Sequence, residues 1–144
     1  MTAQISFRLG RLAKIKDIAR YTFVFPDKDY AVMAERAIAQ LKADGFRLAD
    51  NKAFKNYWEI NNDALKYKGV NIGMYDPATG LKFELQLHAE ASVIAKEAEH
   101  GWYNWTRIPD VTDFEEKAAT VQTNEIFGVV EIPDQAKEVK WGLD

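Results

Sequence analysis

The chain has 144 residues, of which 47% are hydrophobic and 12% aromatic, and its formal net charge is −3. This length and apolar content predict a single domain, residues 1–144, that buries a core without metal or disulfide support. The absence of cysteine excludes disulfide scaffolds, cysteine nucleophiles and thiolate metal sites, and the small net charge argues against general disorder and bulk attraction to nucleic acid.

The first half of the chain predicts a strand, a helix and two short strands. Residues 19–25 are rich in β-branched and aromatic side chains and end at a proline, which is typical of a strand. Residues 28–43 carry apolar side chains at helical spacing, and Gly45 follows just beyond their end, so they predict a helix. Residues 46–49 and 55–60 are candidate short strands.

The second half predicts a hairpin, two helices and a final strand. Residues 70–75 and 81–87 flank the turn sequence DPATG and are expected to pair antiparallel. Residues 89–107 and 113–121 are predicted helices, and residues 125–132 a predicted strand. The order β-α-β-β-β-β-α-α-β indicates an α/β (α+β) fold, with a mixed, largely antiparallel sheet and helices packed on it.

The second hairpin strand alternates between apolar and polar side chains, and its polar residues are Lys82, Glu84, Gln86 and His88. Because directly opposed residues share a sheet face, Glu84 should lie opposite Asn71 or Gly73. An ordinary solvent-exposed sheet face also explains this pattern. Glu is a poor strand former, however, and glycine in a strand often marks close approach by a ligand or another backbone. This strand is therefore our first candidate for an active-site element.

The N-terminal 20 residues are basic although the whole chain is acidic. Asp17 is their only acid, and their cationic residues are Arg8, Arg11, Lys14, Lys16 and Arg20. A solvated basic face and a cradle for phosphates both fit this pattern, and charge alone favours the solvated face.

Four segments together resemble the RelA/SpoT-type alarmone synthetase domain. Residues 16–19 (KDIA) look like the first acidic motif of that family, and residues 67–71 (YKGVN) stand where the family has Gly-Tyr-Arg-Ser-x-His. Residues 83–88 (FELQLH) look like its Glu-x-Gln-x-Arg-Thr strand, and residues 99–100 (EH) match in the following helix. The resemblance covers about residues 14–107 and is closest in spelling to toxin-associated or phage-encoded members.

The resemblance implies a nucleotidyltransferase-like fold and Mg²⁺-dependent transfer of pyrophosphate from ATP to the 3′-hydroxyl of a purine nucleotide, which makes an alarmone-type product. Asp17 and Glu84 would be the catalytic residues and would hold the Mg²⁺ ion, and Glu84 would also accept the proton of the hydroxyl. Tyr67 would stack on the acceptor base. The other nucleotide-binding residues would be Arg8, Arg11, Lys14, Lys16, Arg20, Lys68, Asn71, Gln86 and His88.

Several of these positions depart from the family pattern. Thr22 stands where the first motif ends in Arg, with Arg20 two positions earlier. Asn71 replaces a His, and His88 replaces an Arg. Few residues precede Asp17, so the segment that grips ATP in the family is compressed, altered or missing.

Two alternatives to this function stay open. The short N-terminal segment fits a degenerate relative that binds a nucleotide or a protein without chemistry. The basic N-terminal residues fit a pyrophosphokinase that acts on the tRNA 3′ end, although the net acidity counts against this. For a toxin, an immunity or antitoxin protein is a further expected partner.

The segment MTAQISFRLGRLAKIKD contains no continuous apolar stretch, so we expect no secretory signal. No apolar run approaches the roughly 18 residues that are needed to cross a bilayer. We therefore expect no membrane partner and a cytoplasmic site of action, reached by delivery within a larger effector if the protein acts outside the cell that makes it.

Overall fold

The computed structural model describes residues 2–7, 19–59, 67–106 and 112–142. Within these ranges, residues 2–7, 101–106 and 114–116 are described by their backbone alone. Five predicted site residues lie outside the described residues: Arg8, Arg11, Lys14, Lys16 and Asp17.

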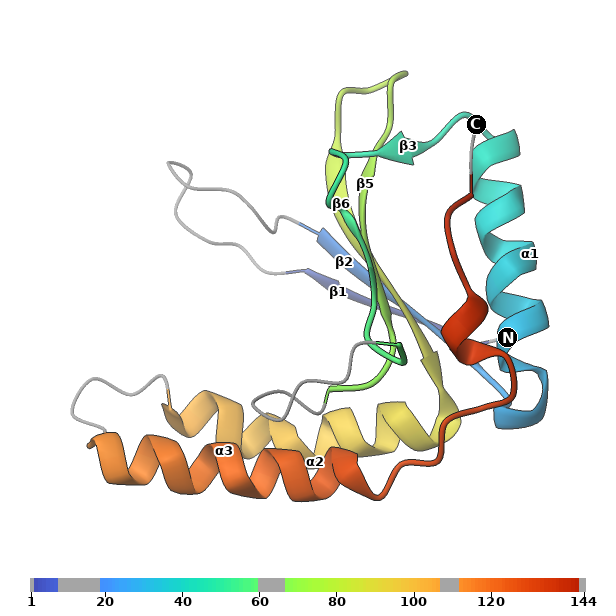
Figure 1. The fold of residues 1–144 in the computed structure, drawn as a ribbon. Coiled ribbons are helices and arrows are strands. Elements are labelled where there is room, and N and C mark those ends of the chain that lie inside the picture. Colours follow the sequence, from blue (N-terminus) through green and yellow to red (C-terminus); the bar gives the residue numbers. More distant parts are fainter. Residues whose placement is uncertain (1, 8–18, 60–66, 107–111, 143–144) are drawn as a thin grey trace.

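A mixed six-stranded sheet forms the centre of the fold, with the strand order β1-β2-β6-β5-β3 and with β4 also paired to β5 (Figure 1). β2 and β6 run parallel, and the other described pairs are antiparallel. The prediction of a mixed, largely antiparallel sheet is thus confirmed. The strands are β1 (Thr2–Phe7), β2 (Ala19–Phe25), β3 (Arg47–Leu48), β4 (Phe54–Asn56), β5 (Val70–Tyr75) and β6 (Lys82–Ala89).

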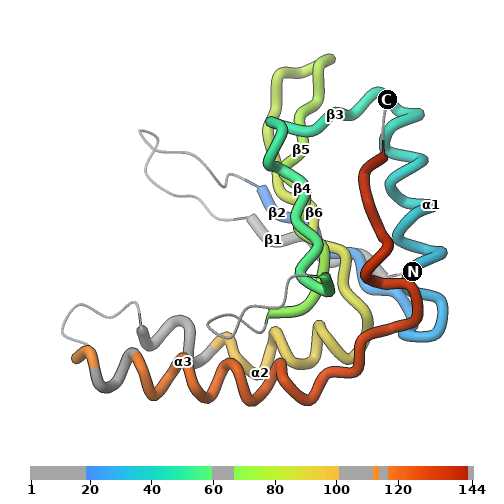
Figure 2. The backbone as a smooth tube through the Cα atoms, viewed as in Figure 1, coloured from blue at the N-terminus to red at the C-terminus, as the bar shows by residue number. Residues whose placement is uncertain are grey.

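Within the described ranges, the helices leave one face of the sheet largely open. α1 (Tyr30–Ala43), preceded by a 3-10 turn at Asp27–Asp29, covers the other face together with the C-terminal segment. α2 (Glu90–Thr106) and α3 (Asp113–Gly128) lie side by side at one end of the sheet (Figure 2). In the described parts of the chain, no helix combines the length and apolar character of a membrane span.

The core lies between α1 and the covered face of the sheet. On β5, Val70, Ile72 and Met74 are fully buried, whereas the alternate residues are only half-buried, as the predicted hairpin requires. Tyr30, the first residue of α1, donates a hydrogen bond from its hydroxyl to the carbonyl oxygen of Leu87 at 2.7 Å. The apolar residues of the helix and of the strands therefore share one core, because helical spacing and strand alternation each place them on a single face.

The C-terminal segment is fixed to this core by a buried amide. The Asn56 side chain donates to the carbonyl oxygens of Ala136 at 2.9 Å and Val139 at 3.0 Å, and makes a longer bond of 3.3 Å to that of Lys137. A short 3-10 turn at Ala136–Glu138 brings these carbonyls together, beside α1 in Figure 1. One side chain of β4 thus holds the chain end over the core.

The predicted final strand at residues 125–132 is wrong, because α3 continues to Gly128 and an irregular segment follows. The β-branched residues suggested a strand, but strand propensity depends on the neighbours that a segment finds. Here the segment packs beside α2, and the fully buried ring of Phe127 lies 5.3 Å from that of Tyr67, centroid to centroid. β1 was not predicted, and the strand expected at residues 55–60 is reduced to Phe54–Asn56.

Candidate functional site

The open face of the sheet brings the predicted polar residues of three strands together. Arg20 on β2 pairs with Glu84 on β6, and Glu84 pairs with Gly73 on β5. In the next row, Thr22, Gln86 and Asn71 are paired in the same way. The predicted opposition of Glu84 with this part of β5 is therefore confirmed, and the parallel strand adds Arg20 and Thr22.

Glu84 is held by two neighbours through the same oxygen. Its Oε1 lies 3.0 Å from Arg20 Nε in an ion pair and accepts a hydrogen bond of 2.8 Å from Gln86 Nε2. The exposed fractions of the side chains are 24% for Glu84 and 34% for Arg20, so both remain in contact with solvent. The arrangement presents an ordered carboxylate next to a guanidinium group, which is able to bind phosphate oxygens.

Lys96 is a site residue that the sequence analysis missed. It comes from α2, and its Nζ donates to Gln86 Oε1 at 2.7 Å and makes a longer contact of 3.4 Å with Thr22 Oγ1. Burial, followed by the charge of Arg20, lowers the pKa of Lys96. The signal that could have found it is its spacing: Lys96 follows the buried Ser92 by four residues and so shares a helix face with it.

A buried hydrogen-bonded chain supports Tyr67. The Tyr67 hydroxyl lies 2.8 Å from His88 Nε2 and 3.1 Å from Asn71 Oδ1, and His88 Nδ1 lies 2.8 Å from Ser92 Oγ. Burial raises the pKa of Tyr67, with a further contribution from the charge of Glu84. Burial and the charge of Lys96 lower the pKa of His88 to about 3, so its ring is neutral at physiological pH. This chain fixes the Tyr67 ring.

The structure places Gln86 and His88 below the open face rather than on it. Their exposed fractions are 4% and 0%, because α2 covers this end of β6 through Ser92 and Lys96. A plain solvent-exposed sheet face is therefore the wrong interpretation for these two residues. The roles expected for them toward a nucleotide stay predictions, and their contacts point to support of Glu84 and Tyr67.

Two glycines of this region make room for parts of the chain itself. Gly69 has a φ of +137°, and a Cβ there would lie 2.9 Å from Cε1 of His88. A Cβ at Gly73 would lie 3.1 Å from the Cβ of Ala53, whose carbonyl oxygen accepts a hydrogen bond from the Gly73 amide at 2.9 Å. Of the two causes considered for Gly73, close approach of another backbone is thus the one observed.

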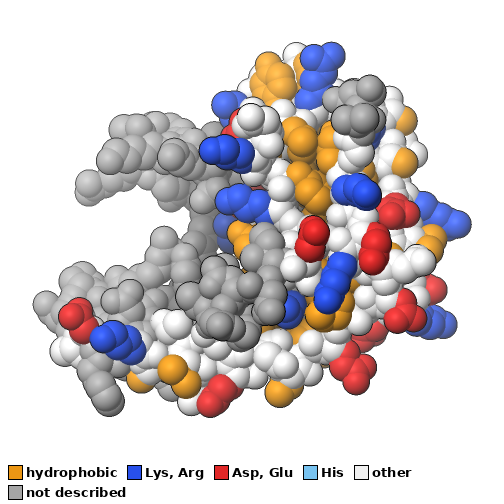
Figure 3. All heavy atoms as spheres, viewed as in Figure 1, with side chains coloured by type: hydrophobic (Ala, Val, Ile, Leu, Met, Phe, Trp, Pro, Cys, Tyr) orange, Lys and Arg blue, Asp and Glu red, His pale blue; other side chains and the backbone are white. Residues whose placement is uncertain are grey.

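A second row of residues on the open face was not singled out from the sequence. Arg47 on β3 pairs with Tyr75 on β5, and Tyr75 pairs with Lys82 on β6, one row beyond Glu84. Arg47 and Lys82 are exposed, and Tyr75 is half-buried. Figure 3 shows Lys and Arg side chains over the sheet above α2 and α3. We call Arg47, Tyr75 and Lys82 the basic row.

The described residues contain no cluster of three or more His, Cys, Asp or Glu residues that could hold a metal ion. Mg²⁺ does not need such a cluster, because it commonly binds through one or two carboxylates together with substrate phosphates and water. Glu84 fits the role of one such ligand. The predicted sharing of the ion with Asp17 stays a prediction, since Asp17 lies outside the described residues.

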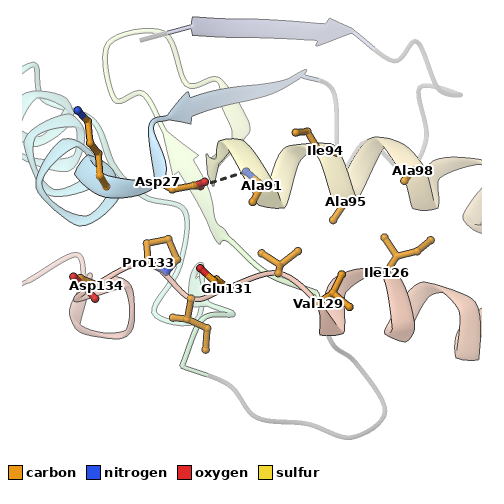
Figure 4. Close-up of a pocket in the computed structure, with 13 residues that line it drawn as sticks. Asp27, Ala91, Ile94, Ala95, Ala98, Ile126, Val129, Glu131, Pro133 and Asp134 are labelled. Carbon is orange, nitrogen blue, oxygen red and sulfur yellow. Dashed lines mark hydrogen bonds between the residues drawn. The ribbon is translucent and has the colours of Figure 1, made fainter.

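An apolar groove of about 750 Å³ lies away from this site, between α2, the 3-10 turn before α1 and residues 126–134. Ala95, Ala98, Ile126 and Val129 line it in Figure 4, and Asp27 accepts a hydrogen bond of 3.3 Å from the Ala91 amide at its edge. None of the predicted site residues lines this groove. The apolar groove and the site around Glu84 are therefore separate surfaces.

Comparison with solved structures identifies the fold as that of the small alarmone synthetases. Small alarmone synthetase 2 from Bacillus subtilis is 16% identical over 90% of this chain and 73% of its own, with a TM-score of 0.64. Small alarmone synthetase 1 from the same organism, bound to its product pppGpp, is 11% identical over 96% and 75%, with a TM-score of 0.61.

A GTP pyrophosphokinase family protein from Streptococcus pneumoniae is 14% identical over 87% of this chain and 69% of its own, with a TM-score of 0.54. No protein-family model matches the chain, and no curated protein matches it significantly. The expected RelA/SpoT-type synthetase fold is confirmed by these structures. Their low identity leaves the reaction to be argued from the residues of this chain.

Proposed function

We propose that this chain is a pyrophosphokinase that transfers pyrophosphate from ATP to the 3′-hydroxyl of a purine nucleotide. The observation that carries the proposal is the setting of Glu84, a partly exposed carboxylate that pairs with Arg20 and accepts a hydrogen bond from Gln86, whose amide oxygen binds Lys96. The alarmone synthetase fold of the chain gives this arrangement its chemical context.

Pyrophosphate transfer needs both cationic groups and a carboxylate. The phosphorus under attack is surrounded by negative oxygens, so cationic groups must stabilise the charge that develops there. Arg20 is close enough to Glu84 to do this, and Lys68 and the basic residues before Asp17 are further candidates for the phosphates of ATP. Glu84 is the group that would accept the proton of the attacking hydroxyl.

Mg²⁺ would be held by Glu84, together with Asp17. The ion would supply charge neutralisation on the phosphates. Arg20 contacts the same carboxylate, so its guanidinium group would turn toward the phosphates when Glu84 holds the ion. The hydrogen bond from Gln86 would hold the Glu84 carboxylate in its orientation.

The acceptor base is proposed to bind at Tyr67. Its ring lies 5.1 Å from that of Tyr57 and 5.3 Å from that of Phe127, so neighbouring aromatic rings fix its orientation. The bonds of its hydroxyl to Asn71 and His88 fix it further. The nucleotide product bound to one structural relative supports a nucleotide as acceptor here.

The basic row favours a second candidate function, transfer of pyrophosphate to the 3′ end of tRNA. Two exposed cations on either side of an aromatic ring are suited to a nucleic-acid strand, since phosphates pair with the cations and a base stacks on the ring. The row lies beside Glu84, where the nucleotide before a reacting 3′ end would pass.

The test is incubation with ATP, Mg²⁺ and each acceptor in turn: guanine nucleotides, adenine nucleotides and tRNA, with the products resolved by mass. We expect one acceptor to gain two phosphoryl groups and AMP to be released. Glu84→Gln should abolish this, whereas the control Glu35→Gln, at an exposed position on α1, should not. Unchanged turnover in Glu84→Gln overturns the assignment. Tight nucleotide binding without any turnover would identify a degenerate domain instead.

A further inference from the structure

Lys96 is a half-buried cation that has no carboxylate within ion-pair distance among the described residues. The oxygens that it contacts, Gln86 Oε1 and Thr22 Oγ1, are both neutral. Glu84, Glu97 and Glu99 act on its charge only from farther away. A buried cation is costly unless an anion compensates it. Neutral oxygens alone are therefore an incomplete environment for this ammonium group.

The position of Lys96 indicates where such an anion would lie. Gln86 donates to Glu84 with its amide nitrogen and accepts from Lys96 with its amide oxygen, so its single side chain joins the two charged groups. Arg20 approaches Glu84 from β2, and Lys96 approaches Gln86 from α2. The two cations thus flank the Glu84–Gln86 pair from different elements of the fold.

Lys96 also has the donor capacity for a ligand. Its ammonium group carries three N–H donors, of which Gln86 takes one in a short bond and Thr22 one in a long bond. The 3.4 Å contact with Thr22 is at the weak end of hydrogen-bond geometry, so little is lost when it is exchanged for a charged oxygen.

We propose that Lys96 is a substrate-binding residue, which receives phosphate oxygens of the pyrophosphoryl group beside Glu84 together with Arg20. The identity of this anion rests on the proposed function. Its position rests on the contacts of Lys96.

Binding of inorganic pyrophosphate, measured by calorimetry without turnover, tests this proposal. Lys96→Met removes the charge and keeps the length of the stem, and Lys96→Arg keeps the charge. A hydrogen bond between charged groups predicts that Lys96→Met weakens binding by about tenfold to a hundredfold. Lys96→Arg should stay close to the wild type. Lys117→Met, on the exposed surface of α3, is the matched control and should bind normally.

The same variants separate binding from support of Gln86. If Lys96 only positions Gln86, Lys96→Met lowers turnover and leaves pyrophosphate affinity unchanged, which overturns the proposal. Absence of pyrophosphate binding in the wild type also overturns it. Thermal unfolding of each variant shows whether it is folded, and Lys96→Gln replaces Lys96→Met if that variant unfolds.

The proposal and the proposed function fail in different ways. If pyrophosphate binding depends on Lys96 but no acceptor gives a product, the anion site is supported and the proposed reaction is wrong. Normal turnover and normal pyrophosphate binding in folded Lys96→Met would support the proposed reaction and show that Lys96 does not bind the substrate.

Discussion

Arg20 and Glu84 are direct partners across the parallel pair of β2 and β6, and their side chains form an ion pair of 3.0 Å. Because the pair is partly exposed, we expect Arg20→Gln to cost no more than about 1 kcal/mol in the free energy of unfolding. Turnover should fall by about tenfold or more if Arg20 also binds phosphate. Urea unfolding and initial rates check this, with the exposed Arg36→Gln on α1 as control. A large loss of stability at unchanged turnover would make the pair purely structural.

Gly69→Ala should destabilise the fold more than Gly45→Ala. Both glycines have positive φ values, +137° and +92°, so alanine is strained at each. Only at Gly69 would the new Cβ meet another group, at 2.9 Å from the His88 ring. We expect losses of about 1 kcal/mol at Gly45 and of about 2–3 kcal/mol at Gly69, from urea unfolding. Equal losses would show that the contact with His88 is easily relieved.

The stability of the protein should fall in acid because His88 is buried in its neutral form. Burial lowers its pKa from the ordinary histidine value of 6.5 to about 3 in the fold. Between these values the unfolded chain binds the proton and the folded chain does not. The stabilisation by His88 is complete above the unfolded pKa and declines as the pH falls toward 3, by at most about 1.4 kcal/mol per pH unit.

Urea unfolding of the wild type and of His88→Gln, between pH 4.5 and 7.5, measures this dependence. The variant should show a flatter curve, because the titrating ring is gone. A wild-type slope in His88→Gln would assign the acid sensitivity to other groups.

Asn56→Ala should release the C-terminal segment from the core. The substitution leaves the buried carbonyl oxygen of Val139 without the donor that now binds it, and leaves that of Ala136 with only the long 3.4 Å bond from the Val139 amide. Unpaired buried acceptors predict a loss of about 2–3 kcal/mol in the free energy of unfolding and faster amide exchange at residues 136–141. Hydrogen exchange measures both the size and the place of the effect. Asn51→Ala, at an exposed turn, should change neither.

The basic row should matter for tRNA and not for a mononucleotide. We expect the double variant Arg47→Gln, Lys82→Gln to weaken tRNA binding and to reduce the salt dependence of that binding, since fewer phosphates are neutralised. Use of a mononucleotide acceptor should stay unchanged. Filter binding over a range of salt concentrations checks this, with Lys28→Gln and Lys137→Gln as exposed controls. Identical salt slopes would remove the support for tRNA.

The sequence by itself determined the hairpin around Glu84, because strand alternation has a period of two and the turn DPATG sets the antiparallel register. The same local patterns predicted α1, α2 and the mixed sheet. They failed at residues 125–132, where the first four residues end α3 and the rest is irregular, with Phe127 buried beside Tyr67. Propensity is local, whereas burial depends on the neighbours that the whole chain supplies.

Only the tertiary structure decided which charges surround Glu84. The register of the parallel pair, which no tight turn sets, placed Arg20 beside it, and the packing of α2 against β6 brought in Lys96. That packing also buried Gln86 and His88, although alternation put them on the polar face. Contacts between distant elements are fixed by the docking of whole surfaces, and therefore the sequence pattern identified Glu84 and Arg20 as site residues but neither their pairing nor Lys96.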